Sequence, residues 1–488
     1  MKVLYIATEC KPYSKVGGVG DVAAELPVAL KEQGVDIEIV TPLYGSTSPD
    51  LYDNSPYGEY KLSYQGKDEI VQIHHGQIKG VPVNLLRNPT YFEGKYGTPY
   101  IFSPTIPFYD DLLRFSFFSE ACLWLINEKK PDIVHINDWA LGYLFGRMFG
   151  EKMPQKRVLT VHNIGYQGNV GKDTIRGWDI ERLLNNDATS QMFTDPRVEW
   201  NSINPLRLAL ELSDMVNTVS PGYCMEITQP EDQSRYFEGG KGLHEIAKRL
   251  CEQGKLIGIL NGFVYNAKPT DKRFLRTLEE KAEMKQIISQ TFQTPEAFLL
   301  GFVGRLAEQK FKLLAEMVDG KTVIEHLLDI PGVNIAFLGT GAPEYENLLR
   351  RLSGRRNCAV SICFDAARAK QISLGSDVFL MPSLYEPCGI TQMESLSNAT
   401  PPLVRWTGGL LDTVKPYTDS DGTGFGFDGS RRDEVLTNLI KAVIDARDYY
   451  QQDKPGFEQL LRRGFRTRFS WAQSAREYIQ KLYEPVMG

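Results

Sequence analysis

Short apolar runs alternate with stretches of helical periodicity along the chain. The run at residues 3–7, rich in β-branched and aromatic side chains, predicts a buried parallel strand. After it, apolar residues recur at helical spacing from Val22 to Leu30, and Gly34 is placed to end this helix. A second strand is expected at residues 36–40. Strands that alternate with helices predict a doubly wound parallel sheet.

The same alternation fills most of the remaining chain. Residues 46–110, rich in Tyr, Gly and Pro, predict loops and hairpins at the edge of the first sheet. The pattern loosens before residue 256, where a new series of strands begins and indicates a second domain. Further strands are predicted at residues 133–136, 158–161, 215–219, 299–303, 333–338, 360–363, 378–381 and 403–405, and helices at 114–127, 206–212, from Ser220-Pro221 onward, and at 456–483.

Composition excludes several classes of function. The 488 residues are 42% hydrophobic and 24% charged, which is typical of a globular protein of two or three domains. A net charge of -6 gives no support to a nucleic-acid partner, and no apolar run has the length of a membrane helix. Seven scattered cysteines without CxxC pairs predict a reduced, cytoplasmic protein without disulfides or a zinc site. Because a strand begins at Val3, we expect no signal peptide.

The loop after the first strand is the first candidate for chemistry, because open parallel sheets bind ligands beyond the carboxyl ends of their strands. It carries Lys15, Gly17, Gly18 and Asp21 at a strand-to-helix turn. Free backbone N–H groups and the positive end of a helix attract anions. The loop therefore predicts a phosphate cradle, with an ordinary glycine-rich turn as the alternative.

Polar residues follow two later strands. Asp138 and Trp139 come after the strand at 133–136, and His162 comes after the strand at 158–161. Clustered polar groups suit a hydroxyl-rich ligand, and an aromatic ring offers an apolar face to a sugar. The plainer alternatives are a helix cap for Asp138 and a core histidine for His162.

Two cations follow the strand at 299–303. Arg305 with its planar fork and Lys310 as a point charge are suited to a diphosphate, with a solvated basic face as the alternative. No metal-spaced His/Cys cluster accompanies them, and Asp419-Ser420-Asp421 is typical of a turn.

The loop after the strand at 378–381 carries a carboxylate. Glu386 precedes Gly389 and Thr391, which lie at the predicted start of a helix. Glycoside chemistry passes through an oxocarbenium-like transition state, so a carboxylate is the expected residue type, and the helix end would bind an anion. The alternative is a surface glutamate before a proline turn.

Taken together, these motifs resemble those of bacterial glycogen synthases and plant-type starch synthases. That family consists of retaining glucosyltransferases with two Rossmann-like domains, the GT-B architecture. The resemblance covers nearly the whole chain and runs, in order, through KVGGVGDV, HINDW, TVHNIGYQG, TVSPGY, GILNG, VGRLAEQK, FLMPSLYEPCGITQ, TGGLLDTV and FSW.

The resemblance implies an α/β fold with two doubly wound domains facing a deep interdomain cleft. Residues 1–254, joined by the closing helix at 465–488, would form the acceptor side, and residues 255–464 the donor side. Such an enzyme would transfer glucose from ADP-glucose to the non-reducing 4-hydroxyl of an α-1,4-glucan with retention of configuration. It would need no metal, because Arg, Lys and a helix end take the metal's place.

The resemblance also implies a role for each matching residue. On the acceptor side, Lys15, Gly17 and Gly18 would meet the donor's phosphates, and Asp21 would lie near the nucleoside. Catalytic roles would fall to residues that contact the glucose and acceptor, neutralise the diphosphate or supply the acidic group: Asp138, His162, Arg305, Lys310 and Glu386. The remaining donor contacts would be Phe364, in place of a tyrosine stacked on adenine, and Cys388, Gly389, Ile390 and Thr391.

Several residues depart from the family pattern: Asn137 and Ala140 at histidine positions, His244 and Val264 at acidic positions, Phe311 at a glycine, Leu384 at an arginine and Glu394 at a tyrosine. Because several of these changes fall around the glucose and the acceptor, two alternatives stay open. One is a related glycosyltransferase with another acceptor or with UDP-glucose as donor. The other is a catalytically weak regulator that binds glucan or nucleotide sugar.

Overall fold

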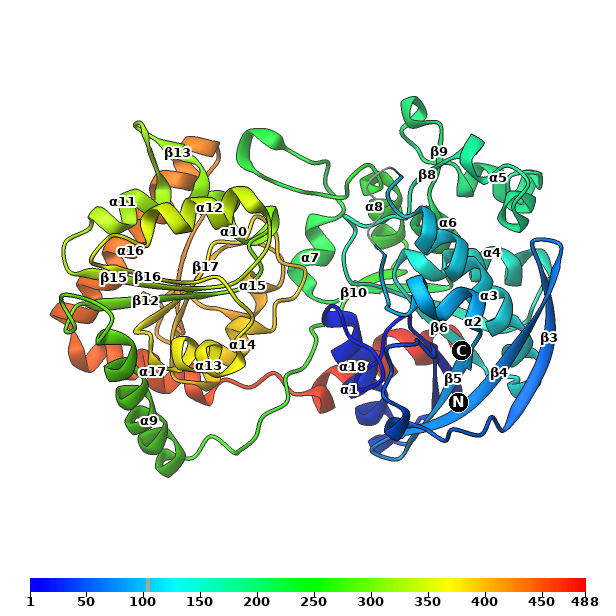
Figure 1. Cartoon of the computed structure of the whole chain (residues 1–488), viewed down its shortest axis with the longest axis horizontal. Helices are drawn as coiled ribbons and strands as arrows, with labels where there is room; N and C mark the ends of the chain where they lie inside the picture. Colours follow the sequence, from blue (N-terminus) through cyan, green and yellow to red (C-terminus); the bar gives the residue numbers. More distant parts are fainter. Residues whose placement is uncertain (102–105) are drawn as a thin grey trace.

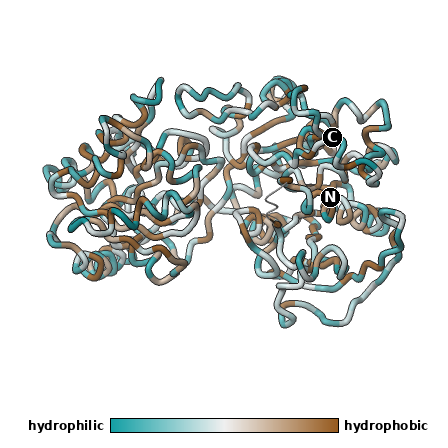
Figure 2. Tube along the Cα trace, turned by 45° about the horizontal axis from the view of Figure 1, so that its top comes forward, coloured by the Kyte–Doolittle hydropathy of each residue, from teal (hydrophilic) through white to brown (hydrophobic). Residues whose placement is uncertain are grey.

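The computed structural model describes residues 1–101 and 106–488, and in it two sheets lie in separate halves of the molecule (Figure 1). The first sheet has the strand order β11-β10-β7-β6-β1-β2-β5-β4-β3, and the second has the order β16-β15-β12-β17-β18-β19. Figure 2 shows apolar stretches running through the interior of both halves, with hydrophilic residues along the outer turns. The predicted fold class, α/β with two Rossmann-like units, is confirmed.

The first sheet is organised around β1, Lys2–Ile6, which pairs in parallel with β2, Asp36–Pro42, and β6, Ile133–Asn137. Beyond β6 follow β7, Lys156–Val161, and β10, Met215–Thr218, also in parallel. The carboxyl ends of these strands therefore lie at one edge of the sheet. This edge carries the glycine loop, Asp138 and His162.

Helices cover this sheet. Helix α1, Gly18–Glu32, buries its apolar face against β1 and is followed by Gly34 at φ +89, as predicted. Helix α3, Tyr109–Lys129, is longer than the predicted 114–127 and is buried along most of its length. Helices α4, Gly142–Gly150, and α6, Pro205–Leu212, lie against each other.

The other edge of the first sheet is a meander, as the Tyr- and Gly-rich stretch predicted. Strands β3, Gly58–Tyr64, and β4, Lys67–Ile78, form an antiparallel hairpin, and β5, Val81–Arg87, returns alongside β2. Part of the predicted excursion, residues 102–105, lies outside the described residues.

The second sheet contains the strands predicted from residue 299 onward, with the one predicted at 360–363 lying two residues earlier. Its ranges are β12, Phe298–Val303; β15, Val333–Leu338; β16, Cys358–Ser361; β17, Val378–Met381; β18, Pro402–Arg405; and β19, Phe425–Phe427. Helices on its faces include α9, Asp271–Ser289; α10, Glu308–Ala315; α13, Ala366–Gly375; α14, Thr391–Ser397; and α16, Arg432–Gln452. All neighbouring strands of this sheet are parallel.

Two expectations need correction. Strand β11, Leu256–Gly258, pairs with β10, so the stretch in which we placed the start of the second domain belongs to the first sheet. The closing stretch is broken after α17, Lys454–Arg466; it resumes as α18, Trp471–Glu477, then continues through a π-helical turn, Tyr478–Tyr483, into α19, Glu484–Met487. The chain crosses between the halves at this break, since α17 packs into the second core and α18 lies against α1 (Figure 1). Periodicity cannot detect this change of partner.

No helix among the described residues combines the length and the apolar character that crossing a membrane requires.

Candidate active site

The glycine loop places Lys15 beside Asp21 and turns its backbone toward an acidic side chain. The Nζ atom of Lys15 lies 2.6 Å from a carboxylate oxygen of Asp21. The backbone N–H groups of Val16 and Gly17 donate to the carboxylate of Glu9, at 2.5 Å and 3.1 Å. Helix α1 then begins at Gly18. Sequence reasoning missed Glu9, although a polar residue shortly after β1 was a usable signal.

The side chain of Asp138 links the loop after β6 to the loop after β7. Its backbone takes φ +57 directly after β6, and Oδ1 accepts the backbone N–H of His162 at 2.7 Å. Its side chain makes no capping bond to the short helix that follows, so the helix-cap alternative is wrong. Burial raises the pKa of Asp138 to about 7, against the opposing effect of the N–H groups that it accepts.

His162 is a buried, neutral ring whose tautomer is fixed by Asn137. The Nε2 atom of His162 lies 2.8 Å from Oδ1 of Asn137, an oxygen that also accepts the hydroxyl of Tyr5 at 2.9 Å. Because this oxygen can only accept, Nε2 carries the proton and Nδ1 is left as an acceptor. Burial lowers the pKa of His162 to about 3. Asn137, which stands at a histidine position of the family pattern, therefore still gives the His162 ring a polar hydrogen-bond partner.

Lys310 and Glu386, 76 residues apart in the chain, form an ion pair. Glu386 follows β17, its side chain is only 8% exposed, and it also accepts the hydroxyl of Ser383 at 3.1 Å. The two loops are also joined through their backbones, because the N–H of Leu384 donates to the backbone oxygen of Gln309 at 2.8 Å. The loops after β12 and β17 thus bring a cation and a carboxylate together.

Two family departures nearby fill the core of the second half. Phe311 is fully buried next to the Lys310 position and packs edge-on against Phe302. Leu384 is 8% exposed and belongs to the same apolar cluster. Phe311 and Leu384 therefore pack into the apolar core beside the Lys310–Glu386 ion pair.

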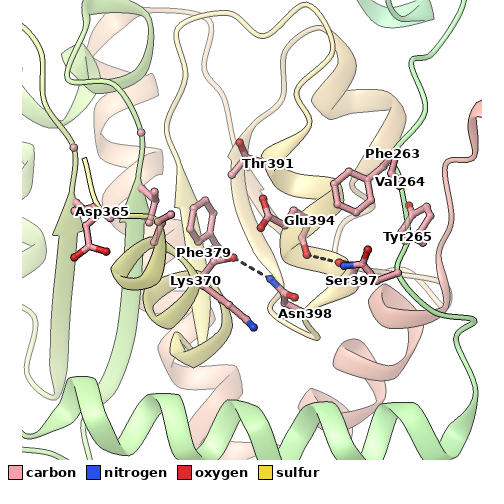
Figure 3. A pocket seen from close by; sticks show the side chains of 18 of the residues that line it. Phe263, Val264, Tyr265, Asp365, Lys370, Phe379, Thr391, Glu394, Ser397 and Asn398 are labelled. Carbon is pink, nitrogen blue, oxygen red and sulfur yellow. Dashed lines mark hydrogen bonds between the residues drawn. The ribbon is translucent and has the colours of Figure 1, made fainter. Parts of the chain in front are cut away.

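A cavity of about 730 Å³ opens between the second sheet and the crossing segments (Figure 3). It is lined by the predicted catalytic residue Arg305, by the predicted donor contacts Phe364 and Thr391, and by Glu394, whose pKa is raised by burial. Phe364 is 97% exposed, and Arg305 forms no ion pair with any residue in the described parts of the chain. An exposed ring and an unpaired guanidinium are free to meet a ligand.

The three predicted donor contacts directly before α14, Cys388, Gly389 and Ile390, do not line this cavity. Cys388 is buried against Val219 of the first half. Gly389 has φ +74, a conformation that strains any other residue, and a Cβ there would lie 2.3 Å from the side-chain oxygen of Gln392. Ile390 precedes Thr391, the first residue of α14.

The halves meet next to this loop. Ser220, which caps α7, Pro221–Glu226, as predicted, donates its hydroxyl to the backbone oxygen of Pro387 at 2.5 Å. At the other end of the helix, Glu226 accepts the backbone N–H of Gly408 at 2.7 Å. The glycine loop, Asp138 and His162 come from the first half and line no part of the 730 Å³ cavity.

Over residues 1–101 and 106–488, no three His, Cys, Asp or Glu side chains are grouped to hold a metal ion. Asp421 in the predicted turn pairs with Lys415 instead.

Comparison with known proteins identifies the family. The family described as "Starch synthase catalytic domain" matches residues 2–249, and "Glycosyl transferases group 1" matches residues 284–454. A glycogen synthase from Caldicellulosiruptor bescii is 34% identical over 514 residues, covering 100% of both chains. This chain belongs to the glycogen and starch synthase family. Among other members, the glycogen synthase of Thermotoga maritima is 34% identical and covers 100% of this chain and 99% of its own.

Solved structures agree with the family assignment. The catalytic domain of starch synthase IV from Arabidopsis thaliana, bound to ADP and acarbose, superposes with a TM-score of 0.82 at 28% identity, over 100% of this chain and 99% of that one. The sucrose-phosphate synthase of Thermosynechococcus elongatus, at 16% identity and a TM-score of 0.59, shares the fold alone. The predicted GT-B architecture is therefore confirmed.

Proposed function

We propose that this protein transfers glucose from ADP-glucose to the 4-hydroxyl at the non-reducing end of an α-1,4-glucan, with retention of configuration. The observation that carries the proposal is the Lys310–Glu386 ion pair at the carboxyl end of the second sheet, where Arg305 also follows β12. Membership of the glycogen and starch synthase family supports it. All seven cysteines are free, which supports a cytoplasmic location.

The two halves would divide the substrates. The cavity belongs to the second half and the crossing segments, which favours residues 255–464 as the donor side. Asp138 and His162 follow strands of the first sheet, which favours residues 1–254, joined by 465–488, as the acceptor side. Strand β11 shifts this boundary by a few residues.

The proposed chemistry uses charge on both sides of the breaking bond. As the C1–O bond of the donor breaks, Arg305 and Lys310 stabilise the leaving diphosphate, and Glu386 opposes the positive charge that develops on the sugar. Phe364 stacks on the base, Thr391 meets the phosphates from within the cavity, and Cys388, Gly389 and Ile390 meet the phosphates and the sugar beside it. Neutral His162 and Asp138 hold sugar hydroxyls.

Closure of the halves would complete the site. Lys15 and Gly18 then reach the phosphates from the first half, and water that would hydrolyse the donor is excluded. In the structure Lys15 is paired with Asp21, so this closure exchanges one anionic partner for another.

A second candidate function is that of a glycosyltransferase with the same fold and a different donor or acceptor. The observation that favours it is the carboxylate of Glu394 in the cavity, at the position where the family pattern has a tyrosine. A carboxylate can only accept hydrogen bonds, so it changes which nucleotide groups are bound. Incorporation of labelled glucose from ADP-glucose and UDP-glucose, each with glycogen, maltooligosaccharides or no acceptor, separates the candidates. Glucan labelling from ADP-glucose is the expected result, and turnover with UDP-glucose alone or with no glucan would contradict the proposal.

A further inference from the structure

The glycine loop holds one of the protein's own carboxylates where an anionic ligand was expected. Glu9 is only 1% exposed and lies inside the turn formed by residues 14–20. Its carboxylate accepts the backbone N–H groups of Val16 and Gly17. A Cβ on Gly17 would lie 3.3 Å from Oε1, and a Cβ on Gly20 would lie 3.4 Å from Oε2. The glycines are therefore packed around this side chain.

This arrangement decides which N–H groups of the loop remain for a ligand. Those of Val16 and Gly17 already have an anionic acceptor. By contrast, the N–H groups of Gly18 and Val19, in the first turn of α1, donate to no residue in the described parts of the chain. Two anions do not share the same pair of donors without strong repulsion. A phosphate that reaches this loop must therefore approach through Gly18, Val19 and the Lys15 side chain.

We propose that Glu9 is a positioning residue, which fixes the glycine loop from inside so that Lys15 and the first turn of α1 face the donor's phosphates. This inference rests on the proposed function for its catalytic consequence. It also replaces the expected role of Gly17, whose N–H serves Glu9 and not the phosphate. Glu9 itself touches no substrate.

If Glu9 instead occupied the phosphate site and had to be displaced by the donor, different kinetics would follow. The carboxylate would then compete with the donor, so its removal would lower the donor KM. A positioning residue organises Lys15, so its removal lowers kcat while leaving ADP binding in the separate 730 Å³ cavity unchanged.

The test uses the full-length Glu9→Gln variant, because an amide offers one accepting oxygen and turns an N–H₂ group toward the loop. We expect kcat to fall about ten-fold or more, with the ADP Kd from calorimetry and the glucan KM within two-fold of the parent protein. In the Lys15→Ala background, Glu9→Gln should cost less than two-fold, because both act through one loop. A lowered donor KM with kcat kept, or fully additive losses, would overturn the proposal.

A second readout is independent of activity. Hydrogen exchange of the peptide covering residues 14–20 should become about ten-fold faster in Glu9→Gln, since two amides lose their acceptor. Unchanged exchange there would overturn the proposal even in an active enzyme. Faster exchange in a protein without any glucosyl transfer would retain Glu9 as the support of the loop and contradict only the proposed function.

Two further variants keep the test decisive if Glu9→Gln fails to fold. Gly20→Ala places a methyl group 3.3 Å from the backbone oxygen of Ser14 and 3.4 Å from the Glu9 carboxylate, so it should disturb the same loop and lower kcat in the same way. Glu25→Gln, in the same helix and paired with Lys79, should leave kcat and loop exchange unchanged. Normal kinetics in a folded Gly20→Ala variant would count against the proposal.

Discussion

The Lys310–Glu386 pair makes the carboxylate the most informative single residue of the site. Glu386→Gln keeps the shape and an oxygen that accepts from Ser383 and Lys310, but removes the negative charge. Because that charge would oppose the developing positive sugar, we expect kcat to fall about 100-fold with little loss of stability. Steady-state kinetics with ADP-glucose and glycogen measure the effect.

Glu308→Gln is the matched control, since Glu308 is an exposed carboxylate of α10 that pairs with Lys312. Its rate should stay within two-fold of the parent protein. A near-normal rate for Glu386→Gln would remove Glu386 from the mechanism.

Asp138 makes stability depend on pH in an unusual direction. Its pKa is raised by burial from 3.8 to about 7, so between these values the folded protein keeps a proton that the unfolded chain has released. Stability therefore falls as the pH rises through this window. Asp138→Asn removes the titration and can still accept the N–H of His162.

We expect the Tm of Asp138→Asn, relative to the parent protein, to be higher at about pH 8 than at about pH 5. Thermal unfolding of both proteins at the two values measures it. A Tm difference that is equal at both pH values would mean that Asp138 is ionised with an ordinary pKa in the folded protein.

At the scale of elements, the sequence predicted what local patterning controls. The strands at residues 333–338 and 378–381 match β15 and β17 without any shift, because their apolar runs are bounded by turn residues. The partner of an element was predictable only where chain order decides it. The pairing of β11 with β10 and the break before Trp471 depend on contacts between distant segments.

The candidate site follows the same rule. The loops after strands made Glu386 and Asp138 candidates for the site, because strand ends are recognisable in a sequence. Two contacts were not predictable: the Lys310–Glu386 ion pair and the hydrogen bond from the Gly17 N–H to the Glu9 carboxylate. Both depend on the folded geometry of the loops.

Helix α18 is the element that returns the chain to the first half, and Trp471 anchors it. Trp471 is 8% exposed in the core beside α1, and its backbone touches Gly262, where a Cβ would lie 2.4 Å from the Trp471 nitrogen. Trp471→Ala leaves a large void in that core, and we expect it to cost about 3–5 kcal/mol. Scanning calorimetry should show the loss as a lower transition for the first half.

Met487→Ala, which shortens a side chain that is 46% exposed near the end of the same segment, should leave the transition in place. Equal shifts for both variants would mean that the closing segment contributes to stability without a specific anchor at Trp471.

On the largest scale, two of the described segments cross between the halves, and hydrogen bonds join them. The backbone N–H of Phe263 donates to the oxygen of Phe469 at 2.7 Å, and the N–H of Phe469 donates to the hydroxyl of Tyr265 at 2.9 Å. Phe263 and Tyr265 also line the 730 Å³ cavity (Figure 3). A nucleotide in the cavity would thus touch the joined segments that connect the halves.

This layout separates binding from catalysis at Lys15. The cavity is built without the glycine loop, so we expect it to bind ADP while Lys15, 45% exposed, is paired with Asp21. Closure would then bring its charge to the diphosphate. Lys15→Ala should lower kcat about 100-fold while changing the ADP Kd from calorimetry less than three-fold. Lys11→Ala, a more exposed lysine 3.9 Å from the same carboxylate, should change neither quantity. Equal losses in kcat and ADP affinity for Lys15→Ala would mean that the loop holds nucleotide in the open protein, and that closure adds nothing through this lysine.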